Sequence, residues 1–128
     1  MDQLQASFVM ELFINGLVSG SLYIAIAIGL TLIFGVLGII NFAHGALYTI
    51  GAYATLEVAS RLGFWPSLVL SPFLVGLIGM MIESLFLRRL YREAPELIML
   101  FTFGLSLFIE EAVRLGWGAG MHTFYAPK

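Results

Sequence analysis

Polar side chains recur at helical spacing inside one of the most apolar parts of this sequence. Five residues follow each other at steps of three or four: Asn41, His44, Tyr48, Gly51 and Thr55. Such steps place residues on one face of an α-helix. An unpaired amide transferred into alkane costs about 4–8 kcal/mol. We therefore expect this face to meet protein or water, where it could hydrogen-bond a neighbouring helix or a solute.

The segment INFAHG (residues 40–45) puts an amide, an imidazole and a glycine close together, and two interpretations stay open. In the structural one, Asn41 hydrogen-bonds a turn, His44 pairs with a neighbouring helix and Gly45 permits close contact. In the functional one, a loosened helix start lines a solute path, as broken helices do in transporters. A catalytic or metal role for His44 is disfavoured, because the other histidine is the distant His122 and no HExxH spacing exists. We predict no cofactor.

Two further patterns concern helix packing. The fourth apolar run carries Thr102, Ser106 and Glu110 at i+4 steps, which predicts a second polar helix face. The first run carries small residues at similar steps: Gly16, Gly20, Ser21, Ala25 and Gly29. Small residues let membrane helices approach closely, so we expect this stripe to be a helix-packing face.

The elements that position these residues must lie in a membrane. The 128 residues are 60% hydrophobic and 11% charged, against about 45–50% and about 25% in soluble domains. The net charge of −2 argues against a nucleic-acid-binding surface, and the absence of cysteine excludes thiolate metal sites. The acidic opening is unlike a signal peptide, so the first apolar segment is expected to remain as a span.

The uncharged stretch Leu12–Leu56 is too long for one crossing. As a single helix its 45 residues would extend about 68 Å, against a hydrocarbon core of about 30 Å. A turn at Gly35–Gly38 divides it into spans of roughly 12–34 and 39–60, each matched to the bilayer. INFAHG then lies at the start of the second helix and loosens it.

Two more spans complete an all-α membrane protein of about four transmembrane helices joined by short loops. The third covers roughly 66–87, with Pro66 suited to a helix start and Pro72 to a kink. The fourth covers roughly 95–116, with Pro95 in its first turn, and a Gly-rich loop over 116–128 follows. We treat 1–128 as a single transmembrane region.

Basic residues predict the orientation. The loop between spans three and four contains a basic cluster: Arg88, Arg89 and Arg92. By the positive-inside rule this loop is cytoplasmic and the N-terminus periplasmic. In this interpretation the cluster also contacts lipid phosphates, and the alternative is that it forms a docking surface for a cytoplasmic partner. We expect Arg61 to pair with Glu57 and Arg114 with Glu110, at i,i+4 spacing, and Glu83 to pair with the cluster.

Three blocks of sequence resemble permease subunits of bacterial branched-chain amino acid ABC transporters. They are GSLYIAIAIGLTLIFGVLGIINFAHGALYTIGAYAT (residues 20–55), IESLFLRRLYRE (82–93) and LFTFGLSLFIEEAVRLGWG (100–118). The resemblance implies an inner-membrane subunit that works with a second permease subunit, cytoplasmic ATPase subunits and a periplasmic solute-binding protein. The sequence lacks a GxxxxGK[ST] motif, so we expect ATP hydrolysis in a partner and no enzymatic activity here.

The function predicted from these observations is the import of branched-chain or other hydrophobic amino acids, by a permease subunit of which this chain is a fragment or truncated form. Family members are longer than 128 residues. The alternative is a small helical membrane protein that acts as an assembly or regulatory partner without a solute path of its own.

Overall fold

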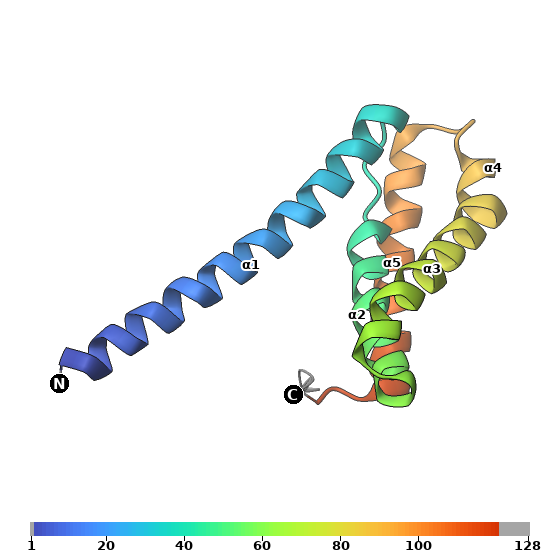
Figure 1. Ribbon diagram of the computed structural model, residues 1–128. Coiled ribbons are helices and arrows are strands. Elements are labelled where there is room, and N and C mark those ends of the chain that lie inside the picture. The colour runs from blue at the N-terminus through green and yellow to red at the C-terminus, as the bar shows by residue number, and fades with distance from the viewer. Residues whose placement is uncertain (1, 121–128) are drawn as a thin grey trace.

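The computed structural model describes residues 2–120 and contains helices but no strand within that range (Figure 1). The elements in chain order are α1 (Asp2–Leu37), α2 (Ala43–Leu62), α3 (Phe64–Ile82), η1 (Glu83–Leu87), α4 (Arg88–Leu90) and α5 (Pro95–Trp117). The prediction of an all-α membrane protein with a loosened second helix is confirmed. Residues 121–128, with His122 and most of the predicted Gly-rich loop, lie outside the described range.

Helix α1 is a long apolar rod that meets the other helices near its C-terminal end only. Its 36 residues extend about 54 Å, and Figure 1 shows it leaving the bundle at an angle. None of the described side chains along α1 is buried. A helix that is hydrophobic all round requires an apolar environment. Gln3–Leu37 and Phe64–Leu90 are both long and apolar enough to cross a membrane.

The break between α1 and α2 lies later than the predicted turn. Gly35 remains helical, α1 ends at Leu37, and Gly38 takes the left-handed conformation (φ 66°) typical of a helix C-terminus. Helix α2 begins at Ala43 instead of residue 39. The Asn41 side-chain oxygen accepts a hydrogen bond from the Ala43 N–H at 3.0 Å, which favours a turn over helix at this point. Bilayer thickness predicts the length of a span but does not specify the residue at which the chain turns.

The third predicted segment is one nearly continuous rod made of α3, η1 and α4. Gly63 (φ 91°) makes the tight connection from α2, and Pro66 lies in the first turn of α3 as predicted. Pro72 lies inside the helix. At η1 the rod widens into one turn of π-helix, a feature that is frequent at functional sites.

Helix α2 packs against both α3 and α5. Its buried residues are alanines, and Ala46 forms a small core with Ile109 and Val113 of α5. Small side chains let the two helix backbones approach closely. In Figure 1 the α1–α2 break and the α4–α5 connection lie at the same end of the bundle, and the α2–α3 turn lies at the other.

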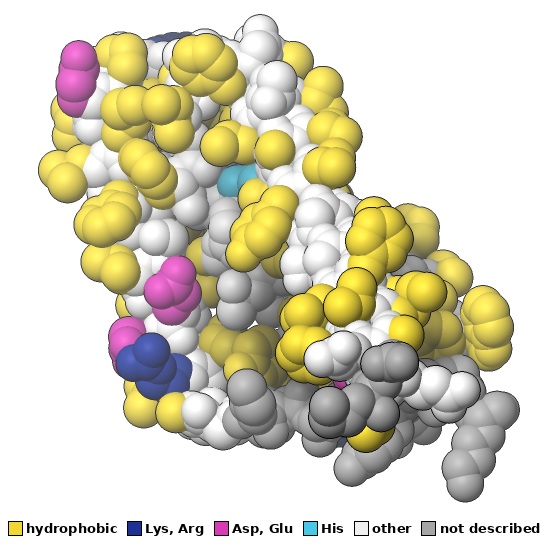
Figure 2. All heavy atoms as spheres, turned by 90° about the vertical axis from the view of Figure 1, so that its left-hand side faces the viewer, with side chains coloured by type: hydrophobic (Ala, Val, Ile, Leu, Met, Phe, Trp, Pro, Cys, Tyr) yellow, Lys and Arg dark blue, Asp and Glu magenta, His cyan; other side chains and the backbone are white. Residues whose placement is uncertain are grey.

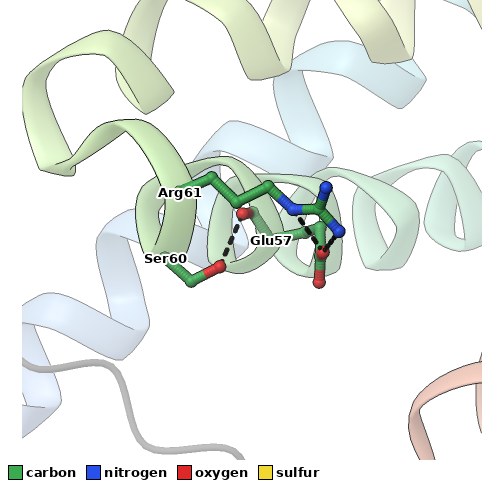
Figure 3. A network of polar contacts seen from close by, with 3 residues as sticks. All are labelled: Glu57, Ser60 and Arg61. Carbon is green, nitrogen blue, oxygen red and sulfur yellow. Dashed lines mark hydrogen bonds and ion pairs between the residues drawn. The ribbon is translucent and has the colours of Figure 1, made fainter.

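The charged pairs agree only in part with prediction. Arg61 pairs with Glu57 as expected, with Nη2 at 2.6 Å from Oε1, while Ser60 donates to the Glu57 backbone carbonyl (Figure 3). Arg114 pairs with Glu111 at 3.1 Å instead of Glu110, because i,i+3 neighbours are as close on a helix as i,i+4 neighbours. Within residues 2–120 these are the only ion pairs, so the expected pairing of Glu83 with the arginine cluster is wrong.

Candidate functional site

The break before α2 is held by a hydroxyl group of α5. The Phe42 N–H donates to Thr102 Oγ1 at 3.2 Å, and that hydroxyl donates in turn to the Met99 carbonyl at 3.1 Å. Thr102 is completely buried. The ring of Phe42 meets that of Phe103 edge-on at a centroid distance of 5.9 Å. The first residue of the predicted α5 stripe therefore fixes the loosened start of α2.

His44 joins α2 to α1. Its imidazole lies so close to Gly29 that a Cβ built on this glycine would be 2.5 Å from Nε2. Gly29 is the last member of the predicted small-residue stripe, and it lies against His44 of α2. A Cβ added at Gly16, Gly20 or Gly45 meets nothing within 4 Å among the described residues. Packing through Gly16 and Gly20 stays a prediction, and no close contact explains Gly45.

A groove of about 610 Å³ lies between α2 and α3. Four of the five residues of the predicted polar face line it: His44, Tyr48, Gly51 and Thr55. Asn41 does not, because it belongs to the break and bonds the Ala43 N–H. The structure thus separates the two residues that the sequence brought together, giving Asn41 a turn-forming contact and His44 a place at both the groove and α1.

The other wall of the groove comes from α3, which sequence reasoning did not connect with the site. Ser71, Val75 and Gly76 all line it. Ser71 is 2% exposed, and its hydroxyl has no hydrogen-bond partner among the described residues. The one signal in the sequence was a serine directly before Pro72 in an otherwise apolar run.

The lining of the groove suits binding more than catalysis. It is mainly apolar, and the part of the chain that the structure describes contributes no acidic, lysine or arginine side chain to it. The Thr55 hydroxyl already donates to the Gly51 carbonyl at 2.8 Å. Such a surface can hold an apolar group, with a few polar atoms to orient it.

A family model described as the branched-chain amino acid transport system permease component matches residues 12–124. The chain belongs to this permease family. The predicted resemblance is confirmed, and the family consists of transport-system components. No solved structure matches the chain.

Curated relatives of this permease chain carry names from the same transport system. It is 38% identical over 117 residues to the high-affinity branched-chain amino acid transport system permease protein BraD of Pseudomonas aeruginosa, covering 83% of this chain and 38% of BraD. It is 34% identical over 122 residues to LivH of Salmonella typhimurium and 32% identical over 124 to LivH of Escherichia coli, each covering 88% of this chain and 39% of the relative. The permease chain spans about two-fifths of the length of these relatives.

The surface of the permease chain fits a membrane setting. Figure 2 shows hydrophobic side chains over much of one face, with a few charged ones at its top and on the left from mid-height downwards. Large exposed side chains include Phe8, Leu32 and Phe73. Lipid is a solvent in which such a surface is stable.

The arginine cluster begins in α4, which lies at the same end of the helix bundle as the α1–α2 break (Figure 1). Arg88, Arg89 and Arg92 are exposed, in α4 and the turn that follows it. Burial, and secondarily the negative charge of Glu83, raises the pKa of Tyr91 above its ordinary value of 10.0. The phenol of Tyr91 therefore stays neutral to a higher pH than an ordinary tyrosine does.

Proposed function

We propose that this chain is part of a permease subunit of an ABC importer that moves branched-chain or other hydrophobic amino acids across the bacterial inner membrane. The family match over residues 12–124 carries the proposal. The relatives' names refer to branched-chain amino acid transport. The polar face of α2 supports a solute path, because His44, Tyr48 and Thr55 line a groove. Contact with lipid alone would not need polar side chains at these positions.

The partners follow from the division of labour in such transporters. The sequence has no phosphate-binding loop, so separate cytoplasmic ATPase subunits would supply the energy. A second permease subunit would complete the path, and a periplasmic solute-binding protein would deliver the amino acid. The exposed cluster Arg88–Arg92 supports a cytoplasmic loop between α3 and α5, with the α1–α2 break on the same side and the N-terminus in the periplasm.

The four transmembrane crossings expected at 12–34, 39–60, 66–87 and 95–116 form part of the same proposal. The observed bounds of α1, α2, the α3–α4 rod and α5 each contain or nearly contain one of these segments. Cysteine labelling with a reagent that does not cross membranes tests the crossings. Ser60→Cys should react from the periplasmic side and Arg92→Cys from the cytoplasmic side, and reaction of both from one side would refute the proposed topology.

Uptake of radiolabelled leucine tests the function. The complete transporter, in a strain without its own branched-chain uptake, should import leucine only when the binding protein and active ATPase are present. His44→Leu should lower uptake more than it lowers the amount of protein in the membrane, because the imidazole lines the groove. Asn41→Leu should lower both, because Asn41 forms the turn.

Thr31→Val is the matched control, since Thr31 is exposed and its hydroxyl bonds only within α1. Uptake by this variant should equal that of the unmodified transporter. Leucine uptake that is absent with all partners present would refute the proposed function. Parallel loss of uptake and protein in His44→Leu would remove His44 from the solute path.

A further inference from the structure

The basic cluster consists of arginines that are exposed and have no ion-pair partner among the described residues. Each of Arg88, Arg89 and Arg92 is exposed. The other two arginines of residues 2–120 each pair with a glutamate one turn away, Arg61 at 2.6 Å and Arg114 at 3.1 Å. A guanidinium with free N–H groups binds the oxygens of a carboxylate or a phosphate. The cluster thus offers anion-binding groups that the described part of the chain does not use.

The carboxylates nearest in sequence do not neutralise the cluster. Glu83, Glu93 and Glu96 make no ion pair within residues 2–120, where both ion pairs involve other glutamates. Glu96 lies in the first turn of α5, where the helix dipole stabilises a negative charge. Residues 88–96 contain three arginines and two glutamates, so this segment carries a net positive charge in a chain that is negative overall. It therefore attracts anions.

The cluster follows an apolar rod at the depth where lipid headgroups begin. Phe64–Leu90 is long and apolar enough to cross a membrane. Arg88 lies about 36 Å along this rod from Phe64, and the hydrocarbon core is about 30 Å thick. With Phe64 at one edge of the core, the first arginine lies about 6 Å beyond the other edge, within the headgroup layer. The arginines can therefore meet phosphate oxygens without entering the hydrocarbon.

Apolar side chains next to the cluster favour a lipid over a soluble partner. Leu85 and Phe86 of η1 are exposed, and so is Leu97 at the start of α5. The ring of Phe86 meets that of Phe101 at a centroid distance of 5.8 Å, which joins the rod to α5. A phospholipid would cover these side chains with its acyl chains while its headgroup meets the arginines. A cytoplasmic protein would cover the arginines alone.

We propose that Arg88, Arg89 and Arg92 bind the headgroup phosphate of an anionic phospholipid whose acyl chains lie against η1 and the first turn of α5. A zwitterionic lipid carries the same phosphate together with an ammonium group, which the arginines repel, so the cluster selects anionic lipids. Each arginine near a membrane surface contributes about fivefold to the attraction of anionic lipid. The inference rests on the proposed crossing of the α3–α4 rod and is independent of the solute that the chain transports.

Native mass spectrometry of the full chain released from detergent micelles measures this preference. The unmodified chain should bind phosphatidylglycerol at least about tenfold more tightly than phosphatidylcholine with the same acyl chains, and Arg88→Gln/Arg89→Gln should reduce the preference at least about fivefold. Arg61→Gln/Arg114→Gln is the matched control, because it removes the same number of positive charges from arginines that are ion-paired. This control should keep the preference within about twofold.

Two further measurements separate charge from folding. Arg88→Lys/Arg89→Lys keeps both charges and should keep the preference within about threefold, because the attraction is mainly electrostatic. Circular dichroism should show the same helix content in all variants. Raising the ionic strength from about 0.1 M to about 1 M shortens the Debye length from about 10 Å to about 3 Å. The preference of the unmodified chain should therefore fall with salt, which tests the inference without any substitution.

Several results would overturn the inference. They are equal binding of the two lipids by the unmodified chain, a preference that salt does not change, and equal loss of preference in the two double glutamine variants. Glycerol 3-phosphate should not displace the lipid at equal concentration, and displacement would show that the cluster is a site for soluble phosphate. Absence of a lipid preference, with an ATPase subunit binding through the arginines, would make the cluster a protein docking surface. Loss of leucine transport with an intact lipid preference would refute the proposed function alone.

Discussion

Replacement of Gly29 by alanine tests whether α1 is held to α2 through His44. The new Cβ would lie 2.5 Å from Nε2 and 2.7 Å from Cε1 of the imidazole, which is closer than atoms in van der Waals contact. Either the imidazole turns away or α1 withdraws. Because α1 meets the bundle mainly through α2, a shift at this point should loosen the whole helix.

The expected cost is about 1 kcal/mol, the low end of the range for overpacking, because the new Cβ meets the far end of a half-buried imidazole that can turn. A change of glycine to alanine within a helix also stabilises by up to about 1 kcal/mol through helix propensity. Gly20→Ala has the same propensity gain and no clash, since a Cβ there meets nothing within 4 Å. The difference between the two variants therefore isolates the steric term.

The free energy of unfolding can be measured by circular dichroism during titration of micelles with dodecyl sulfate. Gly29→Ala should be about 1 kcal/mol less stable than Gly20→Ala. Adding His44→Ala to Gly29→Ala should remove the clash, giving a coupling energy of at least about 0.5 kcal/mol in a double-mutant cycle. Equal stability of the Gly29 and Gly20 variants, with no coupling to His44, would refute this account of the contact.

Three further outcomes are expected. Thr102→Val should leave the Phe42 N–H without its acceptor and lower the free energy of unfolding by about 1–3 kcal/mol. Hydrogen exchange at the Phe42 amide should become faster in this variant and return to normal in Thr102→Ser. Exchange like that of the unmodified chain in both variants would contradict the hydrogen bond. Arg61→Gln should change stability by less than about 1 kcal/mol, because its ion pair is exposed, and a larger loss in the same titration would be inconsistent with that exposure. The raised pKa of Tyr91 means that the folded state keeps a proton that the unfolded state releases near pH 10.0. The contribution of Tyr91 to folding stability is therefore complete below that pH and is lost as the pH rises through the folded pKa. Glu83→Gln should lower the pKa of Tyr91 yet leave it above 10.0, since burial is the larger cause; absorbance titration of the phenolate checks this, and a pKa at or below 10.0 would show that charge dominates.

The sequence by itself determined the features that depend on composition and local spacing. Long apolar runs and bilayer thickness determined an all-α membrane protein. Pro95 determined the start of α5, because proline suits the first turn of a helix. The pairing of Glu57 with Arg61 follows from i,i+4 geometry within one helix. Each of these needs information from only a few neighbouring residues.

The tertiary structure decided what depends on contacts between distant segments. The break before α2 lies where the Phe42 N–H reaches Thr102, 60 residues away, and no local rule specifies that partner. Helix packing likewise placed the His44 imidazole on Gly29 and buried the Ser71 hydroxyl without a hydrogen-bond partner among the described residues. A helical face can be read from spacing, but which helix covers it, and where space is left, depends on how the helices pack.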